Sequence, residues 1–155
     1  MFVHNADIAA IFNQIADLLE IKGDHPFRIG AYRNAARTLA TLATSVQTMI
    51  EEKRDLKDLP GIGLDLSAKI TEIVTTGNCA LHEQLRREMP PLLSALLTVP
   101  GLGPKRVKTL YQEAHIESID QLYRAAGAGQ ISQIRGFGKR VEQRILESVR
   151  AQRSK

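Results

Sequence analysis

The sequence predicts an all-α fold, and three observations lead to that prediction. No segment of the 155 residues alternates apolar and polar side chains with the two-residue period of a half-buried strand. Apolar residues recur instead at helical spacing, in short runs. Glycine, proline or a capping residue separates one run from the next. We therefore expect many short helices in one compact domain or two small ones.

The individual helices follow from these signals in chain order. Residues 5–22, 26–42 and 46–54 are expected to form the first three helices, and proline or glycine bounds most of the later ones. The residues expected to start or stop helices are Asn5, Gly23, Pro26, Ser45, Gly77, Pro90, Pro91 and Ser118. The side chains expected to pack in the first two helices are Ile8, Ile11, Phe12, Ile15, Leu18, Leu19, Phe27, Tyr32, Ala35, Ala36 and Leu39.

A repeated motif interrupts the helical pattern. LPGIGLDLSAKI (59–70), VPGLGPKRVKTL (99–110) and IRGFGKRVEQRI (134–145) align without gaps, with Arg135 in place of proline in the third copy. Each copy has an aliphatic residue, two glycines around an apolar residue, and then a helical pattern. Glycine permits backbone angles barred to other residues, and the apolar residue between the glycines can be buried. We therefore predict three tight turns, each leading into a helix.

A helix that starts at such a turn can bind an anion. Its first N–H groups lack partners, its dipole is positive at that end, and glycine allows close approach. A nucleic-acid phosphate can be held there without its sequence being read. This pattern is the signature of the helix-hairpin-helix motif, with a corner used only for packing as the alternative. The residues predicted to bind phosphate are Gly61, Gly63, Gly101, Gly103, Lys105, Arg106, Lys108, Gly136, Gly138, Lys139 and Arg140. Asp65 follows the first turn and repels phosphate, so the first copy has the least favourable local charge.

Charge is distributed unevenly along the chain. Residues 1–98 contain 10 Lys/Arg and 12 Asp/Glu, a net charge of −2, whereas residues 99–155 contain 11 and 5, a net charge of +6. The basic last third favours an anionic partner, with a solvated basic surface as the alternative.

The single cysteine, Cys79, cannot form an internal disulfide, and no His/Cys spacing indicates zinc. No apolar run approaches the ~18 residues of a membrane span, and no leader segment is evident, so we expect no membrane partner.

Four segments in this order resemble the N-terminal region of bacterial family X (polymerase beta-like) DNA polymerases. They are FRIGAYRNAARTL, LPGIGLDLSAKI, LREMPPLLSALLTVPGLGPKRVKTLY and IRGFGKRVEQRILE. The resemblance implies a polymerase beta N-terminal-like (SAM-like) architecture with a lyase-like domain over 1–78 and a basic helix-hairpin-helix domain over 79–155. It also implies a bacterial, cytoplasmic, nucleoid-associated protein that acts on gapped, nicked or damaged DNA in repair, alongside other repair proteins. No D-x-D or strand pattern is present for the paired carboxylates of a polymerase, so this chain alone is not expected to synthesise DNA.

The resemblance also assigns roles to particular residues. Lys69 falls where lyase-competent members have a Schiff-base lysine, and an ion pair with Asp65, four residues earlier, is the alternative. Arg28 and Tyr32 match contacts to a 5′-phosphate. Phe27 matches a residue that stacks on a template base, with a core position as the alternative. No cofactor is required, but family members hold a monovalent cation, Na+ or K+, on hairpin carbonyls. The matching carbonyls belong to Lys57, Leu59, Ile62, Leu97, Val99 and Leu102.

Three functions are consistent with these residues. Sequence-independent DNA binding is favoured. The second is a 5′-deoxyribose-phosphate or abasic-site lyase that uses Lys69, and the third is a protein-interaction module.

Overall fold

The computed structural model describes residues 2–153, and these form α-helices and short 3-10 helices without a strand, which confirms the all-α prediction. The chain divides into two compact units, Met1–Glu88 (unit 1) and Met89–Lys155 (unit 2). The sequence places the domain boundary after residue 78. In the structure the next helix, α5 (Ala80–Arg87), packs on α1 (Asn5–Lys22) and so lies in unit 1.

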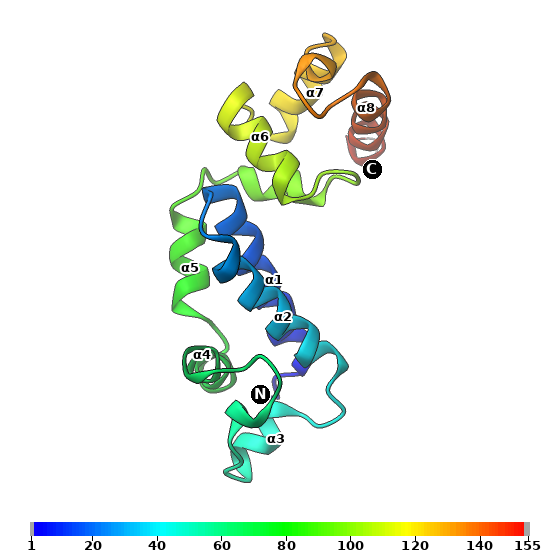
Figure 1. Ribbon diagram of the computed structural model, residues 1–155. Helices are drawn as coiled ribbons and strands as arrows, with labels where there is room; N and C mark the ends of the chain where they lie inside the picture. The colour runs from blue at the N-terminus through cyan, green and yellow to red at the C-terminus, as the bar shows by residue number, and fades with distance from the viewer. Residues whose placement is uncertain (1, 154–155) are drawn as a thin grey trace. The chain divides into compact units, whose positions relative to one another are not determined.

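Unit 1 is built around α1 and α2 (Pro26–Thr41), which lie side by side (Figure 1). Gly23 ends α1 in the left-handed conformation (φ 81°), and Pro26 opens α2 at its first position, as the sequence predicts. Small buried residues on α2 let the two helices approach closely. The residues buried along α1 and α2 are Ile8, Ala9, Phe12, Ile15, Ala16, Leu18, Leu19, Ile21, Tyr32, Ala35, Ala36 and Leu39.

A charged cross-link also joins these two helices. The Arg33 guanidinium of α2 lies 2.7 Å from Asp17 Oδ1 and 3.2 Å from Glu20 Oε2, both on α1. Burial raises the pKa of Asp17 above its ordinary value, and the neighbouring Arg33 offsets only part of that rise. Arg33 therefore serves the packing of unit 1.

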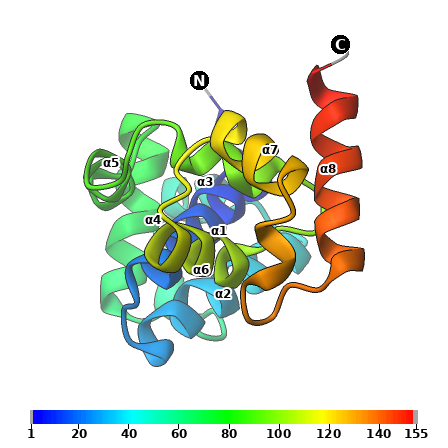
Figure 2. The ribbon, with the colours of Figure 1, turned by 90° about the horizontal axis from the view of Figure 1, so that it is seen from above.

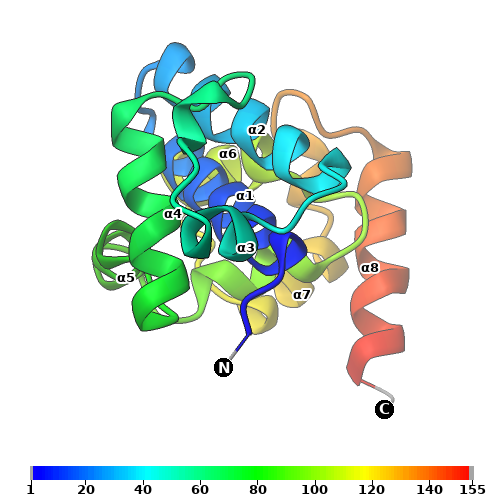
Figure 3. The same ribbon diagram turned by 90° about the horizontal axis from the view of Figure 1, so that it is seen from below.

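The rest of unit 1 is α3 (Val46–Glu51), the 3-10 helix η1 (Leu56–Asp58), α4 (Leu64–Thr76) and α5 (Figure 3). Ser45 caps α3, and Gly77 (φ 80°) ends α4, as the sequence predicts. The expected cap of α1 is wrong by one residue, because His4 is the N-cap and Asn5 lies inside the helix. The Asn5 amide instead donates to the Thr44 carbonyl and accepts the Val46 N–H, so it ties α1 to the segment before α3.

Unit 2 comprises η2 (Leu93–Thr98), α6 (Pro104–Ala114), α7 (Ile119–Gly127), η3 (Ile131–Gln133) and α8 (Lys139–Arg153) (Figure 2). Ser118 caps α7 by accepting the Gln121 N–H, as predicted. α7 packs on α8, and the Arg153 guanidinium lies over the Tyr123 ring while pairing with Asp120. The core of unit 2 includes Leu93, Leu96, Val99, Leu102, Val107, Leu110, Leu122, Ile131, Phe137, Ile145 and Val149.

Candidate nucleic-acid interface

The three glycine turns have the same backbone geometry. The first glycine of each is left-handed, with φ of 75° at Gly61, 89° at Gly101 and 90° at Gly136. The residue between the glycines donates its N–H back to the aliphatic residue before the turn, as from Leu102 to the Val99 carbonyl at 3.0 Å. Ile62, Leu102 and Phe137, the residues between the glycines, are each only 4% exposed. We refer to these turns as hairpins one, two and three.

Hairpin three reaches this geometry without a proline. Arg135 is exposed there, and the Phe137 N–H donates to the Ile134 carbonyl at 2.9 Å. A carboxylate steadies the segment, because Glu142 of α8 accepts the Ser132 N–H at 2.7 Å. The helix-hairpin-helix signature also implies a helix before each hairpin, and its type differs from that of the helix after it. It is a 3-10 helix in all three copies, η1, η2 or η3, rather than an α-helix.

The second glycine of each hairpin has no structural requirement to be glycine. Gly63 and Gly103 have φ of −94° and −88°, an extended conformation open to any residue, and Gly138 also lies outside the left-handed region. A Cβ added at any of the three would meet no atom of the described residues within 4 Å. The first glycines are required by their φ, whereas the second ones leave an open approach to the backbone.

Backbone N–H groups at hairpin two are unpaired within residues 2–153. Those of Gly101, Gly103, Lys105 and Arg106 donate no hydrogen bond there, and both glycines are exposed. The first intrahelical bond of α6 runs from the Val107 N–H to the Gly103 carbonyl. Hairpin two thus presents a cluster of free donors at the positive end of a helix.

The basic side chains of hairpin two fall into two groups. Lys105 is exposed, Lys108 is half-buried, and neither forms an ion pair within the described part of the chain. Arg106 instead turns back on its own loop. Its Nη1 donates to the Gly101 carbonyl at 2.8 Å, and its guanidinium lies 5.8 Å from the centre of the Phe137 ring.

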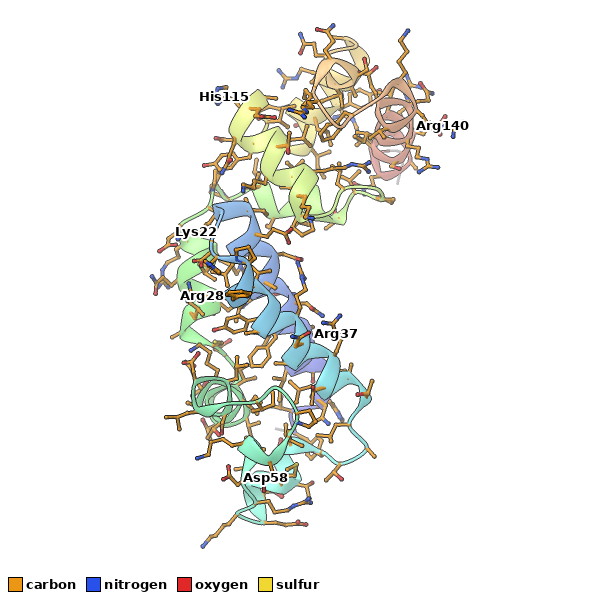
Figure 4. All side chains as sticks on the ribbon, in the orientation of Figure 1. Lys22, Arg28, Arg37, Asp58, His115 and Arg140 are labelled. Atoms are coloured by element: carbon orange, nitrogen blue, oxygen red, sulfur yellow. The ribbon has the colours of Figure 1, made fainter. Side chains whose placement is uncertain are left out.

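Hairpin three carries positive charge at the start of α8. Lys139 and Arg140 are both exposed, and Figure 4 shows Arg140 projecting from this helix. The N–H groups of Gly136, Gly138 and Arg140 donate no hydrogen bond within residues 2–153. Hairpin three therefore has the same combination of free donors and nearby cations as hairpin two.

Hairpin one has the same backbone geometry as the other two hairpins but no basic side chain at the start of the helix that follows it. The first positions of α4 are Leu64, which is 76% exposed, and Asp65, which is also exposed. The Thr38 hydroxyl of α2 donates to the Pro60 carbonyl at 2.9 Å and fastens this loop to the α1/α2 pair. No positional pattern in the sequence pointed to that bond, since the two residues are far apart in the chain.

Lys69 lies with the other predicted contacts of unit 1. Its Nζ is 2.6 Å from Asp65 Oδ1, and the charges of Lys69, Asp65 and Arg28 all act on the Tyr32 hydroxyl. Partial burial lowers the pKa of Lys69, but the hydrogen bond that Lys69 donates to Asp65 and the nearby charges of Tyr32 and Asp65 raise it by more, so the pKa lies above its ordinary value. Arg28 and Lys69 thus lie near enough for their charges to act on Tyr32, while each pairs with an aspartate, Asp24 or Asp65. Burial raises the pKa of Tyr32, so its hydroxyl stays a neutral donor.

Phe27 is the most exposed large apolar side chain of the described residues. It is 84% exposed at the start of α2, so the core position that was the alternative to base stacking is wrong. The His25 ring lies beside it, with centroids 4.9 Å apart and an angle of 38° between the planes. Arg28, the next residue, pairs with Asp24 at 2.9 Å (Figure 4). An exposed aromatic face therefore stands next to a basic side chain.

Two of the carbonyls matched to cation ligands already accept one hydrogen bond each. Leu59 receives the Ile62 N–H at 3.2 Å, and Val99 receives the Leu102 N–H. A carbonyl oxygen has a second lone pair, which stays available at both positions.

Among residues 2–153, no group of three or more His, Cys, Asp or Glu side chains could hold a metal ion. In the same residues, no helix has both the length and the apolar character to cross a membrane.

Comparison with known proteins agrees with this geometry. Residues 3–79 match the family described as "Helix-hairpin-helix domain", and residues 93–151 match "SAM-like Helix-hairpin-helix tandem". The chain is 34% identical over 147 residues, 95% of its length, to "DNA polymerase/3'-5' exonuclease PolX" of Bacillus subtilis. It is 30% identical over 112 residues, 72% of its length, to "DNA polymerase lambda" of Arabidopsis thaliana. It spans only 25% and 20% of these two proteins.

The fold and the three hairpins place the chain in the class of tandem helix-hairpin-helix proteins, and the two family matches agree. More narrowly, it belongs with the N-terminal region of family X DNA polymerases, the region of PolX to which it is similar over almost its whole length. The resemblance predicted from the sequence is thereby confirmed.

Proposed function

We propose that this chain is a sequence-independent DNA-binding module for gapped, nicked or damaged DNA in repair. The helix-hairpin-helix matches and the likeness to polymerases support DNA binding. The observation that carries the proposal is the set of free backbone donors at Gly101, Gly103 and Lys105, beside cations that form no ion pair. Free N–H groups at a helix start are suited to a phosphate oxygen.

The second glycines support the same conclusion. Neither their backbone angles nor their surroundings in the protein call for glycine at Gly63, Gly103 or Gly138. Glycine is also a favoured N-cap, the position that Gly63 and Gly103 occupy, and without a side chain it leaves the backbone open to a group from outside. A phosphate pressed against the backbone would make contact where a Cβ would otherwise stand.

The two units contribute differently in this proposal. Unit 2 carries the net charge of +6 and two hairpins with adjacent cations, so it holds the duplex backbone. Unit 1 is acidic overall, and its exposed Phe27 and adjacent Arg28 face solvent at one helix start. They suit an unpaired base and a phosphate at a gap or strand end, where a base has lost its neighbour and can stack on an aromatic ring.

We also propose that the carbonyl oxygens of hairpins one and two hold a monovalent cation, because those of Leu59 and Val99 each keep a second lone pair. The donor set consists of uncharged oxygens, which suit a weakly bound alkali ion, and the ion would supply positive charge beside a phosphate. The residues that would hold it are Lys57, Leu59, Ile62, Leu97, Val99 and Leu102.

The lyase alternative has less support. A Schiff base forms from a neutral amine, and the ion pair with Asp65 favours the charged form of Lys69. We therefore do not propose lyase chemistry for this chain. The polymerase activity named for its relatives belongs to proteins of which it spans a quarter or less.

Binding of the full chain to four DNAs tests the proposal: intact duplex, nicked, gapped, and gapped with a 5′-phosphate. We expect the gapped forms to bind most tightly, and a change of base sequence to leave affinity unaltered. For about four contacted phosphates, log affinity should fall against log salt with a slope of about −3.6. Absence of binding, or binding that ignores salt, would overturn the proposal and leave the protein-interaction alternative.

Matched variants separate hairpin contacts from overall charge. Lys105→Gln with Lys108→Gln should reduce the steepness of the slope by about 1.8, because two phosphate contacts are lost. Arg86→Gln with Arg87→Gln removes the same charge from exposed positions on α5, outside every hairpin, and should leave the slope unchanged. Equal effects of the two pairs would mean that charge alone, and no hairpin, determines binding.

A further inference from the structure

Arg106 contacts two hairpins at once. Its Nη1 donates to the carbonyl of Gly101 in hairpin two at 2.8 Å. The same guanidinium lies 5.8 Å from the ring centre of Phe137, the buried residue between the glycines of hairpin three. A single side chain therefore touches the turn of one hairpin and the central residue of the other.

The alignment of the three repeats shows that this position faces the protein. Arg106 corresponds to Leu66 in the first copy and to Val141 in the third. Leu66 is buried and Val141 is half-buried. The preceding position, in contrast, carries Asp65, Lys105 and Arg140, which are all exposed. Arg106 thus occupies a packing position, where a planar guanidinium can lie over a ring and donate to a carbonyl together.

We propose that Arg106 is a positioning residue that fixes hairpin two relative to hairpin three, and that it is not itself a phosphate contact. Its bond ties the Gly101 carbonyl to α6, while its guanidinium lies over the Phe137 ring of hairpin three. Both sets of free N–H groups then meet one DNA at a fixed separation. The inference rests on the DNA binding proposed above and changes the role that the sequence suggested for this arginine.

Preorganisation of this kind affects DNA affinity in a recognisable way. Loosening two contact sites weakens binding because ordering them must then accompany association. The number of phosphates contacted stays the same, so the dependence on salt stays the same. A lost phosphate contact would instead make the salt slope shallower.

Two substitutions separate these outcomes. Arg106→Leu restores the residue type of the first repeat, and Arg106→Lys keeps the charge but loses the planar group. We expect both to weaken duplex binding about tenfold at fixed salt, with an unchanged slope. Lys108→Leu, the control on the same helix, should make the slope shallower by about 0.9. A shallower slope for Arg106→Leu, with near-normal affinity for Arg106→Lys, would overturn the inference.

A measurement without DNA keeps the two proposals apart. Hydrogen exchange should accelerate severalfold in Arg106→Leu at two N–H groups, that of Leu102, bonded to Val99, and that of Phe137, bonded to Ile134. Unchanged exchange at both would overturn the positioning role whether or not DNA binds. If wild-type chain fails to bind any DNA while exchange responds as expected, the proposed function fails and the link between hairpins stands as a packing feature alone.

Discussion

Lys69 Nζ lies 2.6 Å from Asp65 Oδ1, one turn earlier on α4. This pair places a carboxylate at the point where the first hairpin would meet a phosphate. It also keeps the lysine charged, because the pKa of Lys69 is raised despite its partial burial. One ion pair therefore disfavours both phosphate binding at hairpin one and Schiff-base chemistry at Lys69.

The ion pair predicts poor Schiff-base chemistry. Wild-type chain incubated with abasic DNA and borohydride at neutral pH should give little trapped adduct. Asp65→Asn removes the charge that favours the ammonium and should increase trapping severalfold, since the neutral amine becomes more abundant. Lys69→Ala is the control that must abolish any adduct. Efficient trapping by wild type, lost on Lys69→Ala, would restore the lyase function.

The two glycines of hairpin two should respond differently to alanine. Gly101→Ala forces an L-residue into φ of 89° and should lower the free energy of unfolding by about 1–2 kcal/mol. Gly103→Ala enters an extended conformation with open space, so stability should change by less than about 1 kcal/mol. Denaturant unfolding measures both.

DNA affinity should follow a different order from stability. Gly103→Ala should weaken duplex binding although it costs less stability than Gly101→Ala, because its methyl group stands where a phosphate would approach. If Gly103→Ala binds as wild type does, close approach of phosphate to this hairpin is ruled out.

Phe27 should matter for unpaired bases only. Phe27→Ala should weaken binding to gapped or single-stranded DNA by about 1–3 kcal/mol, the usual value of one stacked base. Affinity for intact duplex and the melting temperature should stay as in wild type, since the ring is 84% exposed. Phe2→Ala is the matched control, because Phe2 is a second exposed ring of unit 1, at 49%. An equal loss on duplex and gapped DNA would argue against base stacking.

Two carboxyl groups of unit 1 should change its stability in opposite directions as pH falls. Burial raises the pKa of Asp17 above 3.8, so the folded state binds this proton more tightly than the unfolded state. As pH falls through the raised pKa of Asp17 in the folded state toward 3.8, wild type should gain stability relative to Asp17→Asn.

Asp24 supplies the opposite case. Its carboxylate accepts the His25 N–H and pairs with Arg28, and its pKa is lowered. Wild type should therefore lose stability relative to Asp24→Asn as pH falls from 3.8 through the lower pKa of Asp24 in the folded state. Denaturant unfolding of wild type and both variants at several acidic pH values measures these changes. If the free energy of unfolding varied with pH in the same way in all three proteins, both predictions would be contradicted.

The hairpins could be predicted from sequence because their determinants are local. Glycine at a left-handed position and the buried residue after it lie next to each other in the chain, as at Gly101 and Leu102. Helix caps such as Ser45 and Ser118 are local for the same reason. Even the missing proline of hairpin three did not alter the turn, because the N–H of Phe137 closes it.

Features set by distant neighbours were not predicted. Phe27 fits the apolar period of α2, but periodicity does not say whether another element covers that position. The Thr38–Pro60 bond and the Arg106–Phe137 contact join segments that come together only after packing. The same holds for α5, whose placement in unit 1 depends on its contact with α1.

The unequal charge of the two units affects how the chain meets DNA. Residues 89–98 carry no charged side chain, so the totals of −2 and +6 apply to the units themselves. Long-range attraction to a polyanion then acts on unit 2 and is absent for unit 1, so the first encounter is made by unit 2. If unit 2 binds DNA as proposed, the covalent connection would keep unit 1 near the same strand at an effective concentration on the order of millimolar.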